Sequence, residues 1–167
     1  ERVRALILGY QDARRVCLTG GEPTIAPRAA LVWLLRELKA AGRWISIETS
    51  GARPVEELFE WIDFWTVAPK GRSAETFRGD VVEAQVPTLR RFVSLPPERL
   101  QLKFVIQGRE DVEDAVRLLD TLEYRGMIVL QPEHGRGDGG RVFEWWPWSR
   151  YPEARLIPQT HKIVGLH

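Results

Sequence analysis

RVCLTGGEP at residues 15–23 is a short apolar strand pattern that ends in two glycines, an acid and a proline. A strand followed at once by a glycine turn is typical of the strand-to-helix corner of an α/β protein. Leucines and alanines then recur at helical spacing over residues 27–41, and Gly42 ends that pattern. The stretch therefore predicts a β-strand, a turn that a ligand can approach closely, and a helix.

The same alternation of strand and helix patterns continues along the chain. Further strand patterns lie at residues 44–49, 63–68, 100–106, 127–130 and 155–158. Helical patterns lie at residues 3–10, 27–41, 81–95 and 109–124, with a short one opened by Pro54. Pro87 is expected to break or kink the helix in which it falls.

Strand–helix alternation of this kind predicts a parallel sheet with right-handed crossovers. The strands are apolar enough to be covered on both faces. About six strands are too few for a closed eight-stranded barrel. We therefore expect an α/β fold, an open partial (β/α) barrel of mainly parallel strands, with residues 1–167 forming a single domain.

Composition places the chain among ordinary globular proteins. It is 44% apolar and 28% charged, with a formal net charge of +1, which gives no reason to expect nucleic acid or a membrane surface as partner. No apolar run approaches the roughly 20 residues of a membrane-spanning helix, and the start of the sequence lacks a signal-peptide pattern. We expect a reduced, cytoplasmic protein. Its single cysteine, Cys17, excludes an intramolecular disulfide and an all-cysteine metal site built from this chain alone.

Polar residues lie at or near the ends of five consecutive strand patterns: residues 19–23, 48–51, 68–71 and 131–133 end their strands, and Lys103 lies within the fourth. Carboxyl ends of parallel strands meet at one edge, so these groups predict a concave site on one rim. Two adjacent glycines let a ligand approach the main chain, and the exposed carbonyls with the Glu22 carboxylate suit an ammonium group. The alternative for the glycine motif is a strand-to-helix turn in which Glu22 caps a helix.

Residues 16–23 also resemble the segment of radical S-adenosylmethionine enzymes whose glycines and acid hold the amino group of that cofactor. Glu-Thr-Ser-Gly at 48–51, Ala-Pro-Lys at 68–70, Leu-Lys-Phe-Val at 102–105 and Gln-Pro-Glu at 131–133 follow in the order found in the 7-carboxy-7-deazaguanine synthase family. The last ten residues, 158–167, resemble the C-terminus of that family. The resemblance covers essentially the whole chain.

The resemblance implies a cofactor-binding role for eight residues: Gly20, Gly21, Glu22, Thr49, Ser50, Lys70, Lys103 and Gln131. The glycines and the acid would bind the methionine end. Thr49 and Ser50 would lie against its carboxylate or the ribose, with Lys70 as a cation near the same group. Lys103 and Gln131 would reach the ribose or adenine. The alternative for Lys103 is a side chain whose stem packs in the strand while its ammonium reaches the rim.

Two residues of the C-terminal segment are implied to bind substrate, His161 through its side chain and His167 through its α-carboxylate. A carboxylate is a good bidentate partner for the amino-amide edge of a pterin. The alternative for His161 is a solvated or capping histidine in a tail.

The family further implies a [4Fe–4S] cluster held by three cysteines, a Mg²⁺ ion, and an electron donor such as flavodoxin or ferredoxin. This sequence starts inside the helix that normally follows the cysteine loop, so the first strand, the loop and the magnesium-contacting residue are missing from these 167 residues. No catalytic residue and no metal ligand is assigned. Two explanations stay open: an incomplete form of a normal enzyme, or a natural relative that lacks the cluster.

A complete enzyme of this family would be a lyase that converts 6-carboxy-5,6,7,8-tetrahydropterin to 7-carboxy-7-deazaguanine in queuosine biosynthesis. Two rivals are kept. One is another radical S-adenosylmethionine enzyme, of the activating-enzyme type; the other is a cluster-less module that binds S-adenosylmethionine or a purine-like ligand without turnover. Trp145, Trp146 and Trp148 form either a local hydrophobic plug or a dimer contact, and the family implies a homodimer.

Overall fold

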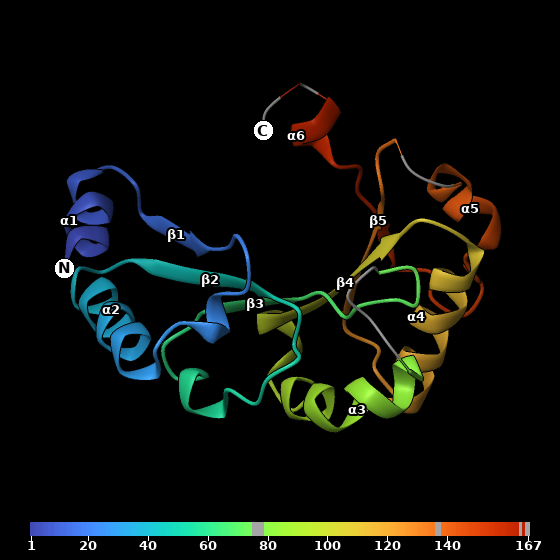
Figure 1. Ribbon diagram of the computed structural model, residues 1–167, viewed down its shortest axis with the longest axis horizontal. Coiled ribbons are helices and arrows are strands. Elements are labelled where there is room, and N and C mark those ends of the chain that lie inside the picture. The colour runs from blue at the N-terminus through green and yellow to red at the C-terminus, as the bar shows by residue number, and fades with distance from the viewer. Residues whose placement is uncertain (75–78, 136–137, 164, 166–167) are drawn as a thin grey trace.

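The computed structural model describes residues 1–74, 79–135, 138–163 and 165 (Figure 1). Within these residues six strands form one all-parallel sheet, and their order in space is their order in the sequence. The strands are β1 (Arg15–Leu18), β2 (Trp44–Thr49), β3 (Phe64–Val67), β4 (Leu100–Ile106), β5 (Met127–Pro132) and β6 (Arg155–Leu156). Each of the six predicted strands is therefore present, with its ends moved by a few residues at most.

Helices connect the strands. The α-helices are α1 (Arg2–Gly9), α2 (Arg28–Ala40), α3 (Val81–Phe92), α4 (Arg109–Thr121), α5 (Val142–Trp145) and α6 (Thr160–Ile163). Short 3-10 helices are η1 (Pro23–Ile25), η2 (Glu56–Leu58), η3 (Pro97–Arg99) and η4 (Gly139–Arg141). The helix predicted at Pro54 is the single turn η2. No helix of the described part is both long and apolar enough to cross a membrane.

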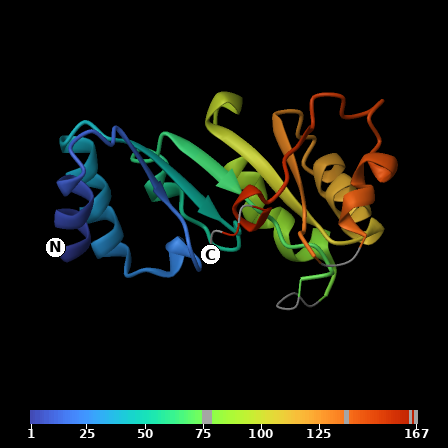
Figure 2. The same cartoon turned by 90° about the horizontal axis from the view of Figure 1, so that it is seen from above.

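The sheet curves, and its connecting helices lie on one side. Because each crossover moves the chain one strand further without reversing direction, α2, α3 and α4 all pack on the same face (Figures 1 and 2). A sheet wound in one direction curls toward closure, and six strands stop short of it. The predicted α/β fold, an open partial barrel, is confirmed.

Only one face of the sheet is buried, which corrects the prediction that both faces are covered. On the helix-covered face, Ile47, Trp65 and Leu102 are fully buried. On β2, β3 and β4 the neighbouring residues point to the other, concave face and are mostly half-buried, as in the alternating pattern of β4. That face carries mostly polar side chains on β2, β3 and β4: Ser46, Glu48, Thr66, Gln101 and Lys103. Polar residues at alternate positions thus leave an open, hydrophilic interior.

Pro87 does not end its helix, contrary to the expectation of a break. Helix α3 runs from Val81 to Phe92 with Pro87 inside it. Val86, Leu89 and Phe92 of this helix are buried, whereas Pro87 is exposed. The carbonyl that loses its amide partner therefore faces water, and burial of the opposite stripe holds the helix together.

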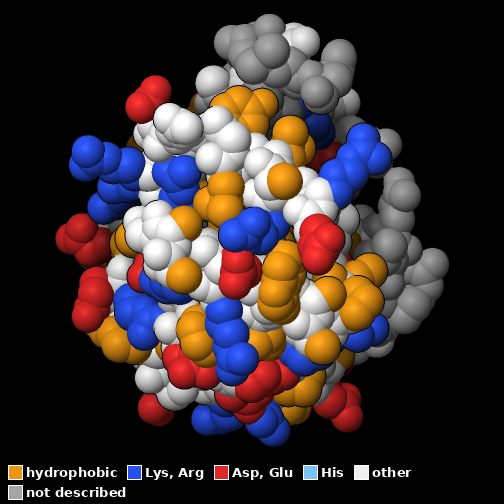
Figure 3. All heavy atoms as spheres, turned by 90° about the vertical axis from the view of Figure 1, so that its left-hand side faces the viewer, with side chains coloured by type: hydrophobic (Ala, Val, Ile, Leu, Met, Phe, Trp, Pro, Cys, Tyr) orange, Lys and Arg blue, Asp and Glu red, His pale blue; other side chains and the backbone are white. Residues whose placement is uncertain are grey.

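Hydrophobic side chains also reach the surface at the α1–α2 end of the molecule. Val3 and Leu6 of α1 and Tyr10, which follows it, are 57–66% exposed, and Trp33 of α2 is 40% exposed. Figure 3 shows that such side chains alternate on this side with charged ones. A small apolar groove of about 230 Å³ lies between the two helices.

Candidate functional site

The carboxyl ends of β1, β2 and β3 enclose a pocket of about 330 Å³. Nine residues line it: Thr19, Gly20, Gly21, Glu22, Glu48, Thr49, Ser50, Ala68 and Lys70. Six of the eight residues predicted to bind a cofactor are among them. Its volume lies within the range of small-molecule sites, roughly 300–1,000 Å³.

Gly20 and Gly21 form the turn that opens this pocket after β1. Their φ angles are +85° and +57°, in the region that favours glycine. A Cβ at either position would meet nothing within 4 Å. The glycines are therefore required by the backbone turn, and the space beside them stays open to a ligand.

The Glu22 carboxylate joins the tips of β1 and β2. Its Oε1 accepts hydrogen bonds from the hydroxyls of Thr24 and Thr49 at 2.7 and 2.6 Å, and from the Thr24 backbone N–H at 3.2 Å. Its Oε2 accepts from the Ser50 backbone N–H at 2.8 Å and the Ser50 hydroxyl at 2.6 Å. Five donors occupy a group that offers about four acceptor sites.

These donors keep the Glu22 carboxylate ionised. Burial alone raises its pKa, but hydrogen bonds from Ser50, Thr49 and Thr24 outweigh burial and lower the pKa to about 2. The contact with the Thr24 N–H also caps η1, so the capping role is confirmed. Both carboxylate oxygens are therefore already occupied by donors of this chain. A direct contact between Glu22 and a cofactor stays a prediction.

Lys70 follows β3, and its backbone is held by the side chain of Gln85 on α3. Gln85 Oε1 accepts from the Lys70 N–H at 2.9 Å, and Gln85 Nε2 donates to the Lys70 carbonyl at 2.8 Å. Lys70 is exposed and lines both the β1–β3 pocket and an adjoining one of about 200 Å³ beside β4 and β5. Gln85 thus fixes the main chain of a residue whose side chain borders two connected cavities.

Two buried aspartates of α4 fix the residues that follow Lys70. Asp111 accepts from the Ser73 hydroxyl at 2.6 Å and from the Gln107 N–H at 2.8 Å. Asp114 accepts three hydrogen bonds from Arg72: from its backbone N–H at 3.1 Å, its Nε at 3.0 Å and its Nη2 at 2.5 Å. The two aspartates are 2% and 1% exposed. The β3–α3 loop is consequently tied to α4 where it leaves the sheet.

Lys103 lies on the concave face of β4 and forms an ion pair with Glu48 of β2. Its side chain is 13% exposed, so the packed-stem alternative describes its surroundings. Lys103 does not line the β1–β3 pocket. Its ion-pair partner Glu48 does line that pocket. On the same face, Gln101 Nε2 of β4 donates to Thr66 Oγ1 of β3 at 2.9 Å.

The structure does not bring Gln131 into the pocket. Gln131 is paired in register with Val105, a residue that lines the smaller adjoining cavity. It thus lies beside that cavity without lining it. The predicted roles of Lys103 and Gln131 at ribose or adenine stay predictions.

The C-terminal segment lies over the open, concave side of the sheet, where Figure 1 places α6 opposite the helix layer. Gln159 Oε1 accepts from the His134 N–H at 3.0 Å, and Lys162 Nζ lies 3.9 Å from Glu133 Oε1. Both contacts join this segment to the end of β5. The side chain of His161 and the whole of His167 lie outside the described residues, so their predicted substrate contacts stay predictions.

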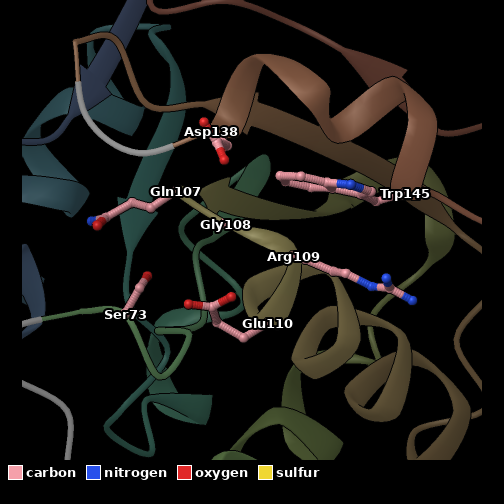
Figure 4. A pocket seen from close by; sticks show the side chains of 7 residues that line it. All are labelled: Ser73, Gln107, Gly108, Arg109, Glu110, Asp138 and Trp145. Atoms are coloured by element: carbon pink, nitrogen blue, oxygen red, sulfur yellow. The ribbon is translucent and has the colours of Figure 1, made fainter.

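A separate open pocket of about 450 Å³ lies where β4 passes into α4. Figure 4 shows the Trp145 ring on one side of it and the polar residues Ser73, Gln107, Glu110 and Asp138 around it. Trp146 is 3% exposed and its indole N–H donates to the Tyr151 carbonyl at 3.3 Å. The plug interpretation is therefore confirmed for Trp146.

Sequence reasoning missed the residues that hold the rim in place, namely Gln85, Asp111 and Asp114. A signal existed for the two aspartates. They share the face of α4 that carries Val112, Ala115 and Leu118. An acidic side chain on such an apolar face is buried on folding and therefore needs a hydrogen-bond donor beside it. Gln85 gave no such signal, because glutamine is common on any helix surface.

The [4Fe–4S] cluster that the resemblance implies does not fit these residues. The chain has one cysteine, Cys17, which is exposed. Over the described ranges no group of three or more His, Cys, Asp or Glu side chains could hold a metal ion. A [4Fe–4S] cluster needs three or four thiolates, so its ligands would have to come from outside these 167 residues.

Curated proteins resemble this chain along nearly its full length. A 7-carboxy-7-deazaguanine synthase of Pyrobaculum aerophilum is 33% identical over 165 residues, covering 96% of this chain and 69% of the relative. The protein of the same name from Neisseria meningitidis is 38% identical over 161 residues, covering 92% and 66%. One from Haemophilus influenzae is 24% identical over 173 residues, covering 99% and 69%. The chain thus spans about two thirds of these relatives. No family model matches it.

The fold and the pocket define an α/β partial-barrel protein with a small-molecule site at the carboxyl ends of its first strands. Within that class, the chain belongs to the 7-carboxy-7-deazaguanine synthase family.

Proposed function

We propose that this chain binds S-adenosylmethionine at the β1–β3 pocket and forms the cofactor- and substrate-binding part of a 7-carboxy-7-deazaguanine synthase. One observation carries the proposal. The glycine turn, the Thr49–Ser50 tip and Lys70 come from three strands and line one pocket. Family membership supports the same ligand, because the residues at these positions are those of the resemblance.

The donors and acceptors of the pocket suit an amino acid headgroup. Backbone carbonyls at the glycine turn would accept from the ammonium. The Lys70 ammonium, which follows β3 and lines the same pocket, would receive the carboxylate. The adjoining cavity, which shares Ala68 and Lys70, would extend the site toward β4 and β5 for the nucleoside.

The proposed reaction is that of a carbon–nitrogen lyase, in which 6-carboxy-5,6,7,8-tetrahydropterin becomes 7-carboxy-7-deazaguanine on the way to queuosine. Bound S-adenosylmethionine supplies the radical chemistry of such enzymes. This chain's own residues would position the cofactor against one C–H bond and limit water at the concave face. Since one cysteine cannot hold the cluster, no redox step is assigned to these residues.

We propose a cytoplasmic, single-domain homodimer that takes its electron from a flavodoxin or ferredoxin. The α1–α2 surface and the tryptophan region are candidate contacts between copies. Light scattering should give twice the 19.2 kDa chain mass; a monomer at all concentrations would remove the dimer.

Calorimetry with S-adenosylmethionine on the 167-residue chain tests the binding proposal. We expect saturable binding, weakened by about tenfold or more in Lys70→Met because a charge-assisted contact is lost. Arg14→Met is the matched control. Arg14 is exposed and precedes β1, so it lies at the amino end of that strand, whereas the pocket lies at the carboxyl end. Absence of binding, or equal losses in both variants, would overturn the proposal.

The single cysteine favours a second candidate, a module that binds S-adenosylmethionine without turnover. Both candidates predict the same calorimetry, so the gene decides between them. Three closely spaced cysteine codons upstream of Glu1, and turnover of the carboxypterin by the protein that includes them, would favour the enzyme. A start codon immediately before Glu1 would favour the module.

A further inference from the structure

We infer that Gln85 is a positioning residue, which sets Lys70 at the pocket so that its ammonium meets the carboxylate of the bound cofactor. The inference rests on the proposed function and adds a residue on α3 that lines neither of the two connected cavities. Lys70 lines both cavities, so its placement affects both.

The contact between Gln85 and Lys70 is reciprocal. The primary amide of Gln85 accepts from the Lys70 N–H at 2.9 Å and donates to the Lys70 carbonyl at 2.8 Å, so both polar groups of that residue's backbone are satisfied by one side chain. Two hydrogen bonds between planar amides fix orientation as well as distance. Among natural side chains of this length only glutamine offers a donor and an acceptor in one plane.

The Gln85 side chain is itself held in place. Gln85 Nε2 also lies 3.3 Å from the Val81 carbonyl, one turn earlier in α3. Asp80 caps this helix, accepting from the N–H groups of Val82 and Glu83 at 2.9 and 3.0 Å. A capped helix presents Gln85 from a fixed first turn, which gives the contact with Lys70 a rigid base.

The other side of Lys70 is also anchored. Gly71 follows it, and a Cβ there would come 2.4 Å from Asp111 Oδ1. Arg72 and Ser73 are bonded to Asp114 and Asp111 of α4. The main chain is therefore fixed from Lys70 to Ser73, while the Lys70 side chain stays exposed to the pocket. A pre-placed cation loses less entropy on binding than a freely moving one.

The test compares two ligands that differ by one group. S-adenosylmethionine has the carboxylate, and decarboxylated S-adenosylmethionine keeps the ammonium, sulfonium and nucleoside without it. Calorimetry on Gln85→Met should show S-adenosylmethionine binding weakened by about tenfold, the effect of about one net hydrogen bond, and the decarboxylated ligand unchanged. In a Lys70→Met background, Gln85→Met should cause no further loss.

Ala84→Met is the matched control, because it adds the same side chain to an exposed position of the same helix. Amide hydrogen exchange at Lys70 provides a second readout on each variant, and it should accelerate in Gln85→Met alone. Gln85→Glu keeps the acceptor for the Lys70 N–H and loses the donor to its carbonyl, so it should give an intermediate affinity.

Equal weakening of both ligands would reduce Gln85 to a purely structural residue and overturn the inference. Unchanged affinity for S-adenosylmethionine in Gln85→Met would overturn it too, while leaving the proposed function intact. If the unaltered chain binds neither ligand, the proposed function fails and the inference fails with it.

Discussion

At the scale of single residues, the Glu22 carboxylate shows how one side chain can assemble a site. It gathers donors from Thr24 on its own turn and from Thr49 and Ser50 on the next strand. The sequence picks out Glu22, Thr49 and Ser50 as separate candidates. It cannot show that they bind one another, because that depends on the parallel register in which Leu18 pairs with Ile47.

Glu22→Gln should destabilise the protein and reduce its sensitivity to acid. The fold lowers the pKa of Glu22 from 4.5 to about 2, so the ionised carboxylate contributes stability above about pH 4.5 that is lost as pH falls toward 2. At pH 7 the variant should lose about 1–3 kcal/mol of unfolding free energy. Urea denaturation at pH 7 and pH 3 measures both effects.

Glu60→Gln is the control for this change, because Glu60 is exposed. We expect it to follow the unaltered chain at both pH values. If Glu22→Gln loses as much stability on acidification as the unaltered chain, the carboxylate is not held as described.

At the scale of elements, strands were predicted well and their surroundings less well. Short apolar runs separated by helical patterns locate all six strands, because a strand in a parallel sheet must be largely apolar. The same runs predicted burial on both faces, which is wrong. Polar residues at alternate positions, such as Glu48 and Lys103, lie on the concave face and form an ion pair there.

Pro87→Ala should stabilise α3. The structure keeps the helix through Pro87 by burying Val86 and Leu89, so the proline remains a local cost that packing overcomes. Alanine restores the missing amide donor and should raise the unfolding free energy by about 1–3 kcal/mol. Thermal and urea denaturation measure the change; a lower stability would mean that the proline shapes the packing of α3.

Gly71→Ala should loosen the loop between β3 and α3. Its Cβ would come 2.4 Å from Asp111 Oδ1, and Asp111 cannot withdraw without leaving Ser73 and Gln107. We expect a loss of about 1–3 kcal/mol in unfolding free energy, as for other overpacked sites. Gly140→Ala is the control, since a Cβ at Gly140 meets nothing within 4 Å. Equal stability of the two variants would contradict the anchoring of this loop by α4.

At the scale of the whole molecule, one rule of chain order explains why the rim exists. Strands laid down in sequence order, with their helices on one side, form a curved sheet whose strand ends face a common centre. That order is readable from the alternation of patterns, which is why the glycine turn, the Thr49–Ser50 tip and Lys70 could be predicted to converge. Gln131 does not line this pocket, because β5 lies two strands beyond β3 in the sheet.

An NMR titration of the 167-residue chain with S-adenosylmethionine shows whether the ligand binds at the β1–β3 pocket. We expect the largest amide shifts to cluster at Gly20, Gly21, Ser50 and Lys70, which follow three different strands and line one pocket. Shifts confined to the Trp145 pocket or the α1–α2 groove, or the absence of any shift at saturating ligand, would contradict it.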